Sequence, residues 1–156
     1  MNLLNFDEKG FLKPYEIIDS DLQFFKAIFV DNMEISKTRK SLFENYLQYL
    51  DAIKNVIPNG FHQWVDGSFV TQKQNPNDID IVTFINFQDF ERNIKTFDIL
   101  RRWRFDKTKG IDGYFVPIFP ENHRKSVIFE MEKKEWIFQF CNDRNGNSKG
   151  IIQISF

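Results

Sequence analysis

Two aspartates that follow a glycine-serine pair are the residues of this chain best suited to chemistry. Asp78 and Asp80 are separated by one residue, and Gly67-Ser68 ends ten residues before Asp78. Because side chains alternate between the faces of a strand, a strand here would point both carboxylates to the same side. Two like charges held this close repel each other, and a bound metal ion would relieve that repulsion. The spacing therefore predicts a site that handles phosphate groups.

The glycine-serine pair suits a phosphate-binding turn. Gly67 has no Cβ, so its backbone can approach a phosphate closely. If Ser68 opens a helix, the free N–H groups of that helix would favour a bound anion. An ordinary strand-to-helix turn with a serine cap explains the same two residues. The pair therefore indicates phosphate binding only in combination with the two aspartates.

A third acid completes a candidate metal site. Asp80 lies in an apolar run, where an ionised carboxylate is costly unless it is paired or metal-bound. Asp112 lies in another strand-forming run, although its glycine neighbours also suit a turn. Three carboxylates on adjacent strands can bind Mg²⁺ or Mn²⁺, and two such ions can hold the attacking and leaving oxygens of an in-line displacement. Asp112 could also accept the proton of the attacking hydroxyl.

The elements that position these residues interleave helices and strands. Apolar periodicity and turn residues predict helices at 22–29, 36–57, 87–103 and 126–140, and strands at 61–65, 78–84, 111–119 and 151–156. The first ~20 residues predict an irregular arm because turn residues recur there. The expected class is α+β or the similar α/β.

The chain length of 156 residues predicts one domain. Its expected parts are an N-terminal arm with a short helix, a core, and a C-terminal helix with a strand, at 1–35, 36–119 and 120–156.

Composition excludes several kinds of site. The 21 basic and 22 acidic residues nearly balance, so the global charge does not indicate a nucleic-acid binder, although a local basic patch remains open. One cysteine, Cys141, excludes an intramolecular disulfide and a cysteine-rich zinc site, and we expect it to be buried. Two histidines, His62 and His123, are too few for a histidine metal site. The chain has neither an apolar run of roughly 20 residues nor a signal peptide, which predicts a cytoplasmic protein without a membrane partner.

The spacing of Gly67-Ser68 and Asp78-Ile79-Asp80-Ile81 resembles the signature of the DNA polymerase β-type nucleotidyltransferase superfamily, especially its minimal members. The resemblance covers roughly 36–116, with Asp112 matching the third acid of that superfamily. It implies a small mixed sheet flanked by helices. It also implies Mg²⁺-dependent transfer of a nucleoside monophosphate from a nucleoside triphosphate such as ATP.

The whole chain also resembles a family of small bacterial proteins with this predicted core. The segments that carry this resemblance are 5–14, 38–39, 64–71 and 143–151. The resemblance does not name the acceptor, which could be a hydroxyl of a protein, an RNA end or a small molecule. Small members of the superfamily often act in toxin–antitoxin or phage-defence systems, and this setting is an expectation from the family alone.

Lysines and an arginine are the candidate phosphate contacts. Many minimal members carry an arginine and a glycine soon after the glycine-serine pair, and this chain has neither at 69–72. Lys73 could replace that arginine or be a solvated loop residue. Arg144 and Lys149 could reach the triphosphate, because cationic groups match phosphate oxygens, or form a charged hairpin tip.

Other polar and aromatic residues leave two readings open. Arg39 and Lys40 could line the site entrance or form a charged helix start. The basic residues of 101–109 could hold a nucleic-acid backbone or form a solvated helix end. Trp64 and Tyr114 are the candidates for stacking on a base.

Three functions remain open at this stage. The first is a nucleotidyltransferase. The second is an inactive nucleotide- or metal-binding module that acts as a regulator or antitoxin-like partner protein. The third is a structural domain without a ligand, which leaves the three aspartates unexplained.

Overall fold

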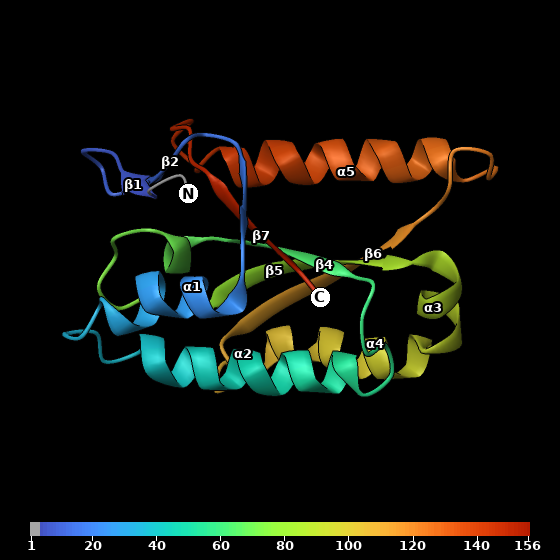
Figure 1. Cartoon of the computed structure of the whole chain (residues 1–156), viewed down its shortest axis with the longest axis horizontal. Coiled ribbons are helices and arrows are strands. Elements are labelled where there is room, and N and C mark those ends of the chain that lie inside the picture. The colour runs from blue at the N-terminus through green and yellow to red at the C-terminus, as the bar shows by residue number, and fades with distance from the viewer. Residues whose placement is uncertain (1–3) are drawn as a thin grey trace.

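A computed structural model describes residues 4–156 of the chain. Figure 1 shows a mixed sheet between helices, which confirms the expected α+β class. The strand order is β3-β7-β4-β5-β6. These strands span Ile17–Ser20, Ile151–Ser155, His62–Asp66, Ile79–Asn86 and Ile111–Ile118, in that order. The β3–β7 and β5–β6 pairs are parallel, whereas β4 pairs antiparallel with both β5 and β7.

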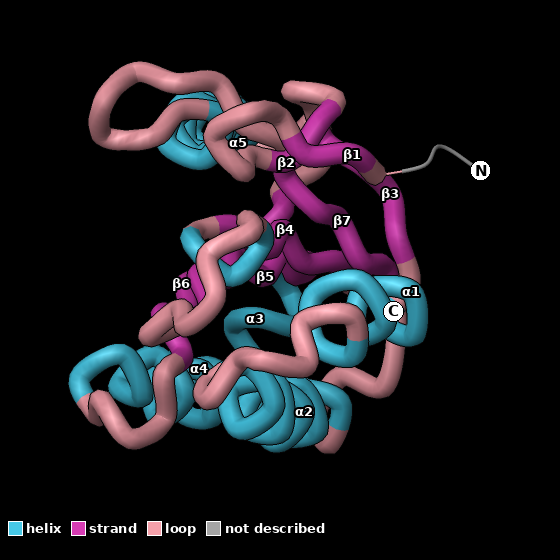
Figure 2. The backbone as a smooth tube through the Cα atoms, turned by 90° about the vertical axis from the view of Figure 1, so that its left-hand side faces the viewer, coloured by secondary structure: helices cyan, strands magenta, loops and turns pink. Residues whose placement is uncertain are grey.

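Helices cover both faces of this sheet. One face carries α1 (Leu22–Lys26) with its π-helical continuation (Ala27–Asp31), α2 (Arg39–Lys54) and α4 (Ile94–Arg101) (Figure 2). The opposite face carries α5 (Ser126–Cys141). The remaining helices are α3 (Phe87–Arg92) and the 3₁₀ turns Ser68–Val70 and Arg102–Phe105. A separate two-stranded sheet pairs β1 (Asn5–Phe6) with β2 (Leu12–Lys13).

The alternation along β5 assigns its side chains to two cores. Ile79, Ile81 and Ile85 are fully buried in the larger core beneath α1, α2 and α4. Val82 and Phe84 are fully buried in a smaller core that includes residues of α5. Since side chains two residues apart share a face, Asp80 points to the α5 side of the sheet.

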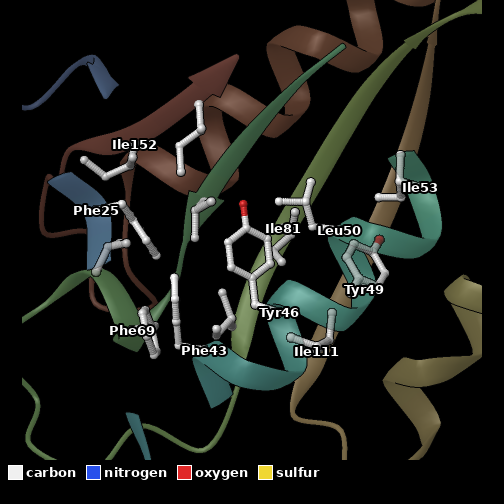
Figure 3. Close-up of a cluster of buried hydrophobic side chains, with 14 of the residues drawn as sticks. Phe25, Phe43, Tyr46, Tyr49, Leu50, Ile53, Phe69, Ile81, Ile111 and Ile152 are labelled. Atoms are coloured by element: carbon white, nitrogen blue, oxygen red, sulfur yellow. The ribbon is translucent and has the colours of Figure 1, made fainter. Parts of the chain in front are cut away.

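Aromatic rings supply much of the larger core (Figure 3). Phe25 stacks on Phe69 with their centroids 5.8 Å apart, so α1 packs directly on the turn after β4. The Tyr46 hydroxyl donates a 2.6 Å hydrogen bond to Gln63, whose amide donates to Thr83. Tyr46, Gln63 and Thr83 therefore satisfy one another, as most buried polar groups do, whereas the buried Tyr49 hydroxyl has no hydrogen-bond partner among the described residues.

Three predicted elements differ from the structure. The prediction of an irregular N-terminal arm was wrong, because residues 5–20 contain β1, β2 and β3. The strand β3 forms an edge of the main sheet. Local pattern could not reveal this because the partner of Ile17 is Ile151. The predicted helix 87–103 is divided at Asn93, and the long core helix begins at Arg39 rather than at residue 36.

Two helices begin with a side-chain cap. Asp21 accepts a 2.7 Å hydrogen bond from the Phe24 N–H, and Asn86 accepts one of 2.9 Å from Gln88. Among residues 4–156, no helix combines the length and apolar character that crossing a membrane requires.

Candidate functional site

Three aspartates form a row across the neighbouring strands β4, β5 and β6, at one end of these strands. Asp66 pairs in register with Asp80, and Asp80 pairs with Asp112. Adjacent strands lie about 4.8 Å apart, so the three carboxylates start from neighbouring backbone positions on the α5 face. The row thus joins the last residue of β4 to the second residues of β5 and β6. Asp66 is the member that sequence reasoning missed, because it lies one residue beyond the predicted strand 61–65.

Asp78 joins this row from outside the sheet. It is exposed and immediately precedes Ile79, so β5 begins one residue later than the predicted strand. Partial burial and then the charge of Asp112 raise the Asp78 pKa, whereas Lys73 lowers it. Asp78 therefore still belongs to the acidic group.

Asp80 is the centre of the negative charge. Burial, followed by the charges of Asp78, Asp66 and Asp112, raises the Asp80 pKa to about 7, although Lys149 acts in the opposite direction. Ionising this carboxylate near neutral pH is unfavourable because water is replaced by neighbouring anions. A cation beside Asp80 would remove that penalty.

Gly67 allows the turn after β4 to pack onto Asp80. Its φ is 78°, and a Cβ at this position would overlap the Asp80 carboxylate. Glycine is thus required by both backbone conformation and space. Ser68 opens only a three-residue 3₁₀ turn, so the expected helix N-terminus that favours anions was wrong. The hydroxyl of Ser68 remains available at the rim of a pocket.

Arg39 holds the loop that follows Gly67. Its side chain is 1% exposed and donates to the carbonyl oxygens of Phe29, Phe69, Thr71 and Lys73 at 2.6–2.9 Å. Neither of the two expected roles, lining an entrance or forming a charged helix start, describes it. One signal was available in the sequence: Arg39 lies three residues before Leu42, on the apolar stripe of α2.

A pocket of about 560 Å³ opens beside this loop. Gly67, Ser68 and Lys73 line it, together with Lys9 from the loop between β1 and β2 and with Lys149. These residues come from three distant parts of the chain and place three lysines around one space. The exposed Arg144 is not among the lining residues, so the structure does not bring this predicted contact to the site.

Lys149 forms a buried ion pair with Asp66. Its Nζ lies 2.7 Å from Asp66 Oδ2, and both residues are buried. Lys149 is therefore not part of a charged hairpin tip, and its ammonium group is not a free phosphate contact. Burial raises the Asp66 pKa to about 6, even though Lys149 and the Gly67 N–H favour the ionised form.

A second pocket, of about 660 Å³, lies at the other end of the acidic row. Asp78 and Asp112 line it, as do Arg104, Phe105 and Lys107. Arg104 Nε lies 3.6 Å from Asp112 Oδ1. Sequence reasoning grouped Arg104 with a general basic cluster and did not connect it with Asp112.

Only one of the two proposed stacking residues is near this pocket. Tyr114 accepts a 2.7 Å hydrogen bond from Arg104, and its hydroxyl lies 3.4 Å from Asp112 Oδ2. Trp64 is 1% exposed, and its indole N–H donates to Gln153, so it cannot stack on a ligand.

The comparisons with known proteins give one finding. A family described as "Family of unknown function (DUF6932)" matches residues 4–155. The chain belongs to this family. No curated protein and no solved structure matches the chain.

The donor atoms of the acidic row fit a hard divalent cation in type. Asp66 Oδ1 and Asp112 Oδ1 are buried and accept no hydrogen bond from the residues that the structure describes. Carboxylate oxygens are the ligands that Mg²⁺ and Mn²⁺ prefer. Within residues 4–156, however, no three His, Cys, Asp or Glu side chains are already grouped as a complete metal site. A cation would therefore require side-chain rotation, for which the exposed Asp78 has the most freedom.

The two histidines and Lys40 lie outside the acidic row. His62 stacks on Phe84, and His123 packs against Phe87. Cys141 is half-buried, not fully buried as expected. Lys40 is exposed beside Arg39 and lines a separate pocket next to α2.

Proposed function

We propose that this chain is a metal-dependent nucleotidyltransferase that moves a nucleoside monophosphate from a nucleoside triphosphate to a hydroxyl group. One observation carries the proposal: the register that aligns Asp66, Asp80 and Asp112 between two pockets, with Gly67 packed on the central carboxylate. The first pocket offers lysines, and the second offers an open approach to Asp112.

Each side of the row has a separate task in this proposal. The triphosphate lies in the first pocket, against the backbone of Gly67, the Ser68 hydroxyl and the Lys73 ammonium. Asp78, Asp80 and Asp112 would hold Mg²⁺ or Mn²⁺. When bound, such an ion supplies positive charge that neutralises the phosphate oxygens and the crowded carboxylates.

The reaction requires one proton acceptor. The acceptor hydroxyl oxygen forms a bond to the α-phosphorus, and the bond from that phosphorus to the bridging oxygen breaks, so that pyrophosphate leaves. Asp112 takes the hydroxyl proton, because it lines the pocket on the acceptor side. Arg104 orients Asp112 for this transfer, since its Nε faces Asp112 Oδ1.

Transfer of label from each NTP tests this proposal. The purified chain is incubated with each α-labelled NTP, Mg²⁺ or Mn²⁺, and cell lysate as a source of protein, RNA and small-molecule acceptors. Asp80→Asn keeps the side-chain shape, and we expect it to reduce transfer by at least about 100-fold because it removes a ligand charge. Asp98→Asn is the matched control, since Asp98 is exposed on α4 and forms only a 3.8 Å surface pair with Arg101. Equal transfer by Asp80→Asn and the unmodified chain would contradict the assignment.

A second candidate is a nucleotide- or metal-binding regulator without catalysis, for example an antitoxin-like partner protein. The buried Lys149 favours it, because its ammonium group already neutralises one carboxylate of the row. Calorimetry with NTP and Mg²⁺ separates the two candidates. Binding without label transfer supports the regulator, whereas binding with transfer supports the enzyme. A toxin–antitoxin or phage-defence setting remains part of the proposal for either candidate.

A further inference from the structure

The basic segment 101–109 concentrates charge beside the second pocket. Five of the 21 basic residues of the chain lie within these nine positions, although the net charge of the chain is -1. The segment covers the end of α4, the 3₁₀ turn Arg102–Phe105 and the loop before β6. Such a local excess of cations marks a surface that attracts anions.

Four residues of this segment form part of the pocket wall, and one of them, Asp106, is acidic. Arg104, Phe105 and Lys107 line the pocket together with Asp78 and Asp112. Cations therefore face two of the predicted catalytic carboxylates across one space. A ligand that carries both phosphate and hydroxyl groups matches this arrangement, because phosphate pairs with the cations and a hydroxyl can reach the acids.

Phe105 adds an apolar surface to this pocket. Its side chain is 79% exposed, and its ring lies within a segment rich in cations. The Arg104 guanidinium lies 5.5 Å from the centre of the Phe105 ring. An exposed ring flanked by cations is the arrangement with which proteins bind single strands, since each base can stack on the ring while its phosphate meets a cation.

Arg104 is held in place on the pocket wall. Its guanidinium lies 4.5 Å from the centre of the Tyr114 ring and donates a hydrogen bond to the Tyr114 hydroxyl. Because it is fixed by a ring and by the nearby Asp112 carboxylate, less side-chain entropy is lost when an anion binds.

We infer that this pocket binds the end of a single-stranded nucleic acid. The terminal base stacks on Phe105, the phosphates contact Arg104 and Lys107, and the terminal hydroxyl faces Asp112. A strand fits better than a free nucleotide because the exposed Arg101 and Arg102 extend the cationic surface beyond the pocket. The fate of the hydroxyl rests on the proposed function: it gains a nucleoside monophosphate, and pyrophosphate leaves.

Binding of fluorescent single-stranded RNA and DNA oligonucleotides, measured by anisotropy over a salt series, tests this inference. Phe105→Ala should weaken binding about 5- to 150-fold, the range expected for the loss of one stacked base. Lys107→Ala should reduce the slope of log K against log salt by about 0.7, the value of one phosphate contact on a single strand. The matched controls are Phe138→Ala and Lys134→Ala, which change an exposed phenylalanine and an exposed lysine on α5 and should leave affinity unchanged.

Two results would overturn the inference. One is the absence of binding by either oligonucleotide at low salt. The other is binding that Phe105→Ala leaves unchanged and that heparin, a polyanion without bases, displaces equally from both proteins. The second result would mean that the surface attracts charge alone.

The Asp80→Asn variant separates this inference from the proposed function. It should bind the oligonucleotide as the unmodified chain does, while label transfer is lost. Strand binding without any transfer by the unmodified chain supports the pocket assignment and contradicts the transferase. Transfer to a protein acceptor without strand binding supports the transferase and contradicts the pocket assignment.

Discussion

Asp66 and Asp112 are the two neighbours of Asp80 in the sheet, and each has a cationic partner. Lys149 lies 2.7 Å from Asp66, and the two side chains are 11% and 3% exposed. Arg104 lies 3.6 Å from Asp112, and these side chains are 33% and 32% exposed. The same pairing of charges therefore occurs in two very different surroundings.

The buried Lys149–Asp66 pair supports the fold, whereas the partly exposed Arg104–Asp112 pair can exchange its contact for water. Separating the Lys149–Asp66 pair would leave an unpaired charge in a medium that solvates it poorly. At the Arg104–Asp112 pair, water can replace either partner, so loss of the pair would not disrupt the fold. The acidic row thus has a rigid end and an open end, and the open end is the one beside the second pocket.

The largest expected effect is at the rigid end. Lys149→Met should lower the free energy of unfolding by about 3–5 kcal/mol, because it leaves Asp66 buried without its partner. Urea denaturation measures the change. The double variant Asp66→Asn, Lys149→Met should recover most of it, since both charges are gone. A loss below about 1 kcal/mol in the single variant would show that Asp66 reaches water and that the two ends are alike.

An intermediate effect is expected from pH at the centre of the row. The Asp80 pKa rises from 3.8 to about 7 on folding. The folded state therefore binds the proton more tightly, so stability falls as pH rises from about 4 to about 7 and is level above that. The shift corresponds to about 4 kcal/mol at most, because one pKa unit is about 1.4 kcal/mol.

Urea denaturation from pH 4 to 8, in the presence of a chelator, measures this fall. Asp80→Asn cannot ionise at this position, so its stability should depend less on pH and exceed that of the unmodified chain at pH 8. Asp66, with a pKa of about 6, contributes a smaller fall that the variant retains. If the stability of the variant depended on pH as that of the unmodified chain does, the raised pKa assigned to Asp80 would be contradicted.

The smallest expected effect is at the open end. Arg104→Ala should change the free energy of unfolding by less than about 1 kcal/mol, because the pair with Asp112 is partly solvated. The same denaturation curves measure it. A loss as large as that of Lys149→Met would mean that both pairs support the fold, and the distinction between the ends would disappear.

The residues recognised from the sequence share a local signal. Asp80 and Asp112 each interrupt an apolar run, and Gly67 stands at a turn between two strand patterns. Strand alternation then placed Asp80 correctly on one face, because that alternation is a property of a single strand. The same argument does not apply to Asp78, because the strand begins one residue later, at Ile79.

The residues that were missed or misassigned depend on distant contacts. Arg39 bonds to carbonyl oxygens up to 34 residues away, and Lys149 reaches an aspartate 83 residues away. Arg104 meets Asp112 because a 3₁₀ turn and a loop bring the chain back beside β6. No pattern within one element encodes such pairings.

The amino-acid sequence by itself determined the class of the fold, most of the helices and strands, and the acids that interrupt them, because these follow from local periodicity and turn chemistry. Only the tertiary structure decided that β3 pairs with β7, that Asp66 joins the row, and that each flanking carboxylate has its own cation. Burial and charge pairing between distant segments arise only after the sheet has assembled, and they distinguish the buried Asp66 from the partly exposed Asp112.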